Sequence, residues 1–201
     1  MEERYHPEDH VEVRIEKLFR VALHDEGVAS EIRNQIAKLC DAISLEKVER
    51  ILGEKVIPIA NNIRDAAKSL ERLALDITTD PWRPWPIAEC KESATEISRQ
   101  LSPLWSAKWE AEESKEKPKN GHDQDSSDLE YRLGRISGEA DSLLSLLGNQ
   151  YFDGENSRTI LLYGRAGTGK SHLLGSVAQR AVSEGRRAIF ILGQHLREGL
   201  K

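Results

Sequence analysis

The sequence predicts a mainly α-helical region followed by an α/β unit, in which a βαβ arrangement carries an incomplete parallel sheet. Apolar residues repeat at steps of three and four across residues 8–109, as in helices with one buried face. Residues 110–128 are charged and contain no large apolar side chain, which predicts a flexible linker. Two short apolar runs flank a glycine-rich loop within residues 129–201, which predicts the start of a truncated α/β domain. The helical region is therefore expected to span residues 1–109.

Each helix of the first region is predicted by its own apolar stripe. Pro58 suits the first turn of the helix that carries the stripe Ile59 to Ala74, because that position needs no backbone N–H. Three prolines within residues 80–86 predict that this helix ends before them. The next stripe, Ile87 to Leu104, also contains a proline, Pro103. The stripes consist of Val28, Ile32, Ile36, Leu39, Cys40 and Ile43, then Ile59, Ile63, Ala66, Ala67, Leu70, Leu73 and Ala74, then Ile87, Cys90, Ala94, Ile97, Leu101 and Leu104.

The net charge, the cysteines and the lack of long apolar segments restrict the classes of function that are expected. The 201 residues carry a formal net charge of -5, so no global basic field attracts nucleic acid, and a nucleic-acid partner is left undecided. Cys40 and Cys90 have neither disulfide-framework nor metal-ligand spacing, which predicts two thiols in a reducing compartment. No run is long and apolar enough for a membrane helix, and the charged N-terminus lacks a signal-peptide core. We therefore expect a cytoplasmic protein without membrane contact.

The C-terminal third is expected to alternate between helices and strands. Residues 127–130, Ser-Asp-Leu-Glu, form a capping box ahead of a helix that Gly148 ends. Residues 159–163 form a short apolar run that predicts a buried strand, and residues 188–192 predict a second. Between them, a helix is predicted from Lys170 to about Glu184.

The loop between the two apolar runs matches the phosphate-binding pattern G-x-x-x-x-G-K-[ST] at every fixed position. Glycines allow consecutive backbone N–H groups to surround phosphate oxygens without an intruding Cβ, and the next helix directs its positive end at the same oxygens. Lys170 is expected to contact the β- and γ-phosphates as the catalytic residue, and Ser171 to bind Mg²⁺. The predicted ATP·Mg²⁺ site comprises Gly164, Arg165, Ala166, Gly167, Thr168, Gly169, Lys170, Ser171 and His172.

An acidic partner for this loop is missing. A hydrolysing P-loop enzyme needs a carboxylate at the end of another strand to hold Mg²⁺ and position water. Residues 172–201 contain no apolar run ending in Asp or Glu. Half of an ATPase site is therefore expected, with little turnover by this chain alone.

Residues 160–174, Ile-Leu-Leu-Tyr-Gly-Arg-Ala-Gly-Thr-Gly-Lys-Ser-His-Leu-Leu, resemble the nucleotide-binding start of bacterial STAND-type ATPases, most closely the antiviral (AVAST-like) group. Residues 192–194, Leu-Gly-Gln, resemble the end of the next strand in that group. The resemblance implies an antiviral defence switch in which ATP binding supports homo-oligomerisation after a sensor region meets a foreign (phage) protein. Neither a sensor nor an effector is recognisable in this sequence.

Three interpretations remain open from the sequence. The first is an ATP-dependent signalling or defence switch. The second is a DNA-associated AAA+ ATPase similar to a helicase loader, which predicts salt-sensitive DNA binding. The third is a helical interaction module whose P-loop is inert, which predicts self-association through residues 8–109.

Overall fold

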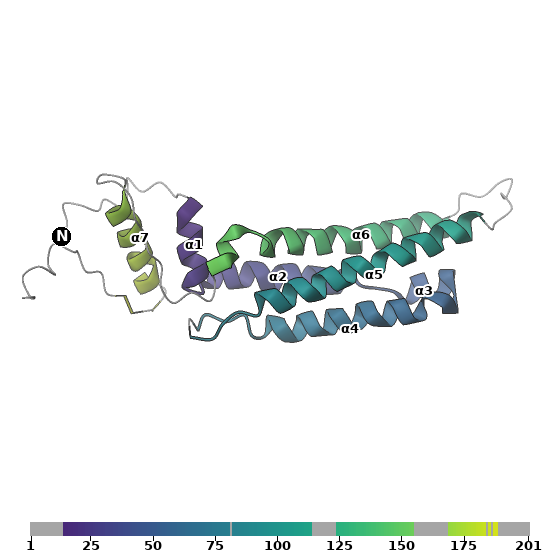
Figure 1. Ribbon diagram of the computed structural model, residues 1–201, viewed down its shortest axis with the longest axis horizontal. Helices are drawn as coiled ribbons and strands as arrows, with labels where there is room; N and C mark the ends of the chain where they lie inside the picture. The colour runs from purple at the N-terminus through teal and green to yellow at the C-terminus, as the bar shows by residue number, and fades with distance from the viewer. Residues whose placement is uncertain are drawn as a thin grey trace, which may run out of the picture.

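The computed structural model describes residues 14–80, 82–113, 124–154, 169–183, 185 and 187–188, and all regular structure within those ranges is helical (Figure 1). The elements in chain order are α1 (Arg14–Ala22), α2 (Glu26–Ala42), α3 (Glu46–Leu52), the 3-10 turn η3 (Glu54–Val56), α4 (Ile57–Ala74), α5 (Ile87–Glu113), α6 (Gln124–Leu147), the 3-10 turn η4 (Gln150–Gly154) and α7 (Lys170–Ser183).

Four of these helices form an elongated bundle. α2, α4, α5 and α6 run alternately up and down, and each packs against two of the others in the cyclic order α2, α4, α5, α6 (Figure 1). α1 and α7 lie at one end of this bundle, which we call the α1 end, and α3 lies at the other. Short connections between antiparallel neighbours are typical of such bundles.

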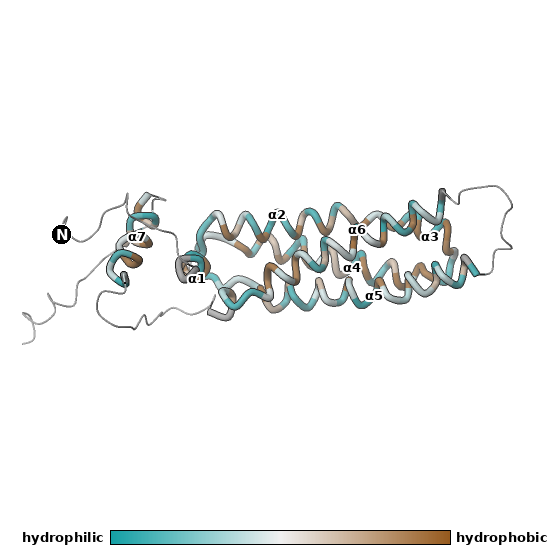
Figure 2. Tube along the Cα trace, turned by 90° about the horizontal axis from the view of Figure 1, so that it is seen from above, coloured by the Kyte–Doolittle hydropathy of each residue, from teal (hydrophilic) through white to brown (hydrophobic). Residues whose placement is uncertain are grey.

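The predicted apolar stripes form the bundle core. All six side chains of the α5 stripe are at most 3% exposed. Four of the six α2 stripe residues and three of the seven α4 stripe residues are buried with them, and the others are partly buried against the same core. Figure 2 shows hydrophobic positions recurring along each helix of the bundle between hydrophilic ones. The helical prediction for this region is therefore confirmed, and Pro58 occupies the first turn of α4 as expected.

The predicted fold class for the C-terminal part is wrong. No strand occurs among the described residues, and Ala188, the first residue of the second predicted strand, has no regular structure. The first predicted strand, residues 159–163, and residues 189–192 lie outside the described residues. Among the described residues, α7, the helix predicted to connect the two strands, packs against α1. A physical reason is that a two-stranded parallel sheet has open edges and too little covered surface to be stable by itself.

α6 joins the bundle from the C-terminal side of the predicted linker. It begins at Gln124, ahead of the predicted capping Ser127, and packs along α5 and α2. α5 in turn continues to Glu113, beyond the predicted start of the linker. Residues 124–147 therefore complete the core that the earlier helices begin, since Leu133, Ile136 and Leu143 are fully buried in it.

The α1 end of the bundle is held by a buried polar group. Asp25 is 2% exposed and accepts hydrogen bonds from Arg20 Nε and Nη2 (3.1 and 2.6 Å) and from the Val28 amide (3.2 Å), which caps α2. Beside it, His24 stacks on Trp85 with ring centroids 4.4 Å apart and donates from Nδ1 to the Asp80 carbonyl (2.8 Å). These contacts fix the α1–α2 corner to the connection between α4 and α5.

At the opposite end, an ion pair joins α3 to α4 and makes stability depend on pH. Arg64 Nη1 and Nη2 lie 2.6 and 2.8 Å from the two Glu49 carboxylate oxygens, and these hydrogen bonds hold the pKa of Glu49 below its ordinary value. A carboxyl with a lowered folded-state pKa stabilises the fold above its unfolded pKa, about 4.3, and this contribution disappears as pH falls through the folded pKa.

Replacing Arg64 with methionine is therefore expected to lower the free energy of unfolding by about 0.5–1 kcal/mol at pH 7. The difference between wild type and variant should shrink as the pH falls below about 4. Urea titrations at pH 7, 5 and 3 would measure this, with methionine at the exposed Arg50 as the control. A difference that stays constant across these pH values would contradict the assignment.

Candidate functional site

The described part of the phosphate loop lies at the start of α7. Gly169 has a φ of +75°, a left-handed conformation that glycine adopts without strain, and α7 begins at the next residue, Lys170. The Leu173 amide donates to the Gly169 carbonyl at 3.0 Å and closes the first turn. The predicted helix start at Lys170 is therefore confirmed, and the helix ends at Ser183, ahead of Gly185 with its φ of +77°.

The structure brings four of the nine predicted site residues together in this turn. Gly169 and Ser171 are exposed, and Lys170 and His172 are half-buried. The other five, Gly164, Arg165, Ala166, Gly167 and Thr168, lie outside the described residues. The geometry of the described residues thus concerns only the C-terminal half of the loop.

This first turn is suited to an anion. The first backbone N–H groups of a helix have no partner within the helix, and the helix dipole adds partial positive charge there. A Cβ built on Gly169 would meet no atom of the described residues within 4 Å. The Lys170 ammonium and the Ser171 hydroxyl supply the donor and the oxygen ligand that a phosphate–Mg²⁺ group needs. The residues present therefore fit the predicted ligand.

Part of the surface of α7 is covered by packing. Leu173, Ser176 and Ala181 are buried, and α7 packs against α1 at the α1 end of the bundle (Figures 1 and 2). α1 in turn packs against η4, whose Phe152 belongs to the bundle core. Helix α7 is thus attached to the bundle through α1.

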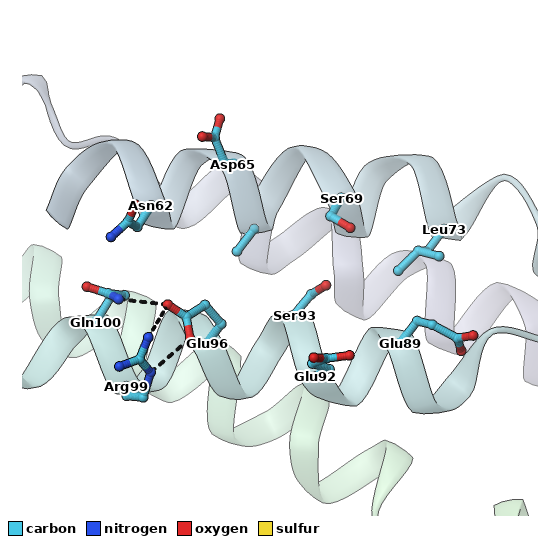
Figure 3. Close-up of a pocket in the computed structure, with 11 residues that line it drawn as sticks. Asn62, Asp65, Ser69, Leu73, Glu89, Glu92, Ser93, Glu96, Arg99 and Gln100 are labelled. Carbon is cyan, nitrogen blue, oxygen red and sulfur yellow. Dashed lines mark hydrogen bonds and ion pairs between the residues drawn. The ribbon is translucent and has the colours of Figure 1, made fainter. Parts of the chain in front are cut away.

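A groove of about 670 Å³, which the sequence did not indicate, lies between α4 and α5 (Figure 3). Four carboxylates and a single guanidinium line it together with small polar side chains. Glu96 accepts hydrogen bonds from Arg99 and Gln100, which lower its pKa. The lining residues are Asn62, Asp65, Ala66, Ser69, Leu73, Glu89, Glu92, Ser93, Glu96, Arg99 and Gln100.

The groove arises where polar positions of two helices face each other beside the core stripes. Asp65 and Ser69 are four residues apart in α4, as are Glu89 and Ser93 in α5, so each pair lies along one side of its helix. Helical spacing could have suggested this alignment, but only packing shows that the two sides meet. In the residues that the structure describes, no group of three or more His, Cys, Asp or Glu side chains is arranged to hold a metal ion.

The two cysteines are not reactive centres in this fold. Cys90 is buried, and Cys40 is half-buried beside α4, with its Sγ 3.7 Å from the Ala67 carbonyl. Burial, and secondarily the charges of Glu71 and Asp41, raise the pKa of Cys40 to about 11. Since the thiolate is the nucleophilic form, this raised pKa disfavours the reactive form of Cys40 at neutral pH.

No known protein family, curated protein or solved structure matches this chain. Within the described ranges, every helix is too short or too polar to cross a membrane. Any assignment of function must therefore come from the residues themselves.

Proposed function

We propose that the chain binds a nucleoside triphosphate, ATP with Mg²⁺, through residues 164–171. The observation that carries the proposal is the agreement of motif and local structure. The G-K-S end of the motif coincides with a left-handed Gly169 and with a helix that starts at Lys170. The phosphate pattern requires this register, because the amides of the first turn and the lysine must face the same oxygens.

In this proposal, each residue of the first turn has a separate task. The backbone amides at the start of α7 donate to phosphate oxygens, and the Lys170 ammonium neutralises charge on the β- and γ-phosphates. The Ser171 hydroxyl is a ligand of Mg²⁺, and His172 lies at the edge of the site. Bound Mg²⁺ would offset the charge of adjacent phosphate oxygens. Turnover is not part of the proposal, because residues 172–201 contain no apolar run that ends in a carboxylate.

Replacing Lys170 with alanine is expected to weaken ATP binding about 10- to 100-fold, since a hydrogen bond to a charged group contributes about 1.5–3 kcal/mol. Titration of a fluorescent ATP analogue in the presence of Mg²⁺ would measure it. Lys68→Ala is the matched control, because that lysine lies exposed on α4. Equal affinities for wild type and Lys170→Ala would exclude this site.

The wider role that we propose is an ATP-dependent signalling or defence switch in the cytoplasm. It is supported by the resemblance of residues 160–174 and 192–194 to the STAND-type group, and by the large helical bundle that accompanies the loop. Nucleotide-dependent assembly measured by light scattering would test it. The role fails if ATP binds and the molar mass is unchanged both with and without a phage-protein extract.

A second candidate is favoured by the bundle itself. Most described residues belong to a four-helix bundle that carries an acidic groove and exposed aromatic side chains, such as Trp109 and Tyr131. Such a bundle can act as an interaction module with an inert loop. Stable self-association that neither ATP nor Lys170→Ala alters would favour this candidate over the switch.

A further inference from the structure

The two most exposed large apolar side chains among the described residues lie on the same segment, the connection between α4 and α5. Leu75 is 77% exposed and Trp82 is 70% exposed. The connection lies at the α1 end of the bundle (Figure 1). An ion pair between Asp76 and Arg83 joins its two sides, and each partner is the chain neighbour of one of these apolar residues. We call Leu75, Asp76, Trp82 and Arg83 the connection patch.

The backbone beneath this patch is held by hydrogen bonds from the helical bundle. Arg33 of α2 donates to the Ile77 carbonyl at 2.7 Å, which fixes one side of the connection. His24 donates to the Asp80 carbonyl at 2.8 Å, and the Asp80 carboxylate accepts from the Trp82 amide at 2.9 Å. Because the segment is already ordered, binding through Trp82 loses little conformational freedom.

The connection patch combines the kinds of side chain on which protein interfaces depend most. Tryptophan and arginine are enriched among the residues that dominate binding energy. Trp82 offers a large apolar area and loses only two side-chain torsions when it is buried. Asp76 and Arg83 are 43% and 56% exposed, so both charges are accessible to a partner. The patch is therefore suited to contact with another protein surface.

The charges of the patch favour a second copy of this chain as that partner. In a two-fold interface, a residue i of one copy contacts j of the other, and j contacts i. The single carboxylate of Asp76 can then meet the partner's Arg83 while Arg83 meets the partner's Asp76. A uniformly acidic or basic surface would instead place like charges beside one of the two. An anionic membrane would likewise meet Asp76 and the exposed Asp80.

We propose that the chain forms a two-fold dimer through the connection patch, with Trp82 of each copy packed on the apolar surface of the other. The Asp76–Arg83 pair within each chain is exchanged for two such pairs between the copies. The inference goes beyond nucleotide binding and gives a surface to the self-association that the second candidate function requires. A patch of this size predicts a weak dimer, with a Kd on the order of 100 μM.

Sedimentation equilibrium of the full chain without nucleotide, from about 5 μM to about 1 mM, brackets this Kd and tests the proposal. The mass should rise from that of the monomer towards twice that value. Trp82→Ala should weaken the dimer at least about 10-fold, because the side chain is lost from both halves of the interface. Trp109→Ala is the matched control and should leave the Kd unchanged, since Trp109 is 58% exposed in the last turns of α5 at the opposite end of the bundle.

An exchange of charges tests the two-fold arrangement itself. Asp76→Arg places two cations in the patch, and Arg83→Asp places two carboxylates there. Each variant alone should therefore self-associate at least about 10-fold more weakly than wild type. An equimolar mixture restores both opposite-charge pairs across the interface and should associate at least as tightly as wild type. Circular dichroism would verify that each variant is folded.

A wild-type chain that stays monomeric at the highest concentration overturns the proposal. It is also overturned if Trp82→Ala and Trp109→Ala weaken the dimer alike, or if the mixed charge variants associate no more tightly than either variant alone. Flotation with phosphatidylcholine–phosphatidylserine vesicles, without self-association, would assign the patch to a membrane instead. These measurements omit nucleotide, so their failure does not affect the proposed ATP site, and Lys170→Ala should dimerise as wild type does.

Discussion

Replacement of Trp85 by alanine is expected to lower the free energy of unfolding by about 3–5 kcal/mol. Trp85 is 1% exposed, stacks on His24, and donates from Nε1 to the Thr78 carbonyl at 2.7 Å. The variant loses the buried ring area and leaves the Thr78 carbonyl without this donor. It also removes the surface on which His24 stacks at the α1 end of the bundle.

Trp82 provides a matched control three residues away. It is 70% exposed, so Trp82→Ala should change the free energy of unfolding by less than about 0.5 kcal/mol. Urea unfolding followed by circular dichroism at 222 nm would compare the two variants without relying on tryptophan fluorescence. A loss below about 1 kcal/mol for Trp85→Ala, or equal losses for both, would contradict the packing described here.

Replacement of Asp25 by alanine is expected to lower the free energy of unfolding by about 2–4 kcal/mol, because it removes a helix cap and breaks an ion pair whose carboxylate is buried. The substitution leaves the Val28 amide and the Arg20 guanidinium without the oxygen that accepts from both. Asp25→Asn should recover part of the loss, since an asparagine side chain can still cap the helix.

Asp76→Ala is the control for Asp25→Ala, since Asp76 pairs with Arg83 at the surface with 43% of its side chain exposed. Exposed ion pairs contribute little to stability, so Asp76→Ala should lower the free energy of unfolding by less than about 1 kcal/mol. Thermal unfolding followed by circular dichroism would rank the three variants. If Asp25→Ala lowers the stability no more than Asp76→Ala does, Asp25 does not stabilise the α1–α2 corner in the way described.

The helical half of the protein was predictable because its signal is local. A stripe such as Ile87 to Leu104 repeats at helical spacing, and burying it needs only some apolar partner. The start of α7 was predictable for a similar reason, since the left-handed Gly169 ends the loop and the helix begins at the next residue, Lys170. The strands were a weaker inference, because a run of five apolar residues has no helical or strand period of its own.

The predicted α/β arrangement failed where it required distant partners. A parallel strand needs a neighbour and a covering layer, and within the described ranges α7 finds α1 instead. Helices also extend into both ends of the predicted linker, whose residues 114–123 lie outside the described residues. Charge composition does not prevent residues at its edges from continuing helices that are already packed, as α5 and α6 do.

The sequence by itself determined the stripes that become buried and the position at which α7 begins, since these depend on residue type and short-range spacing. Only the tertiary structure decided that Trp85 is buried while Trp82 is exposed, that four carboxylates line one groove between α4 and α5, and that α7 packs against α1. The physical reason is that packing joins residues far apart in the chain, and local periodicity does not specify which faces meet.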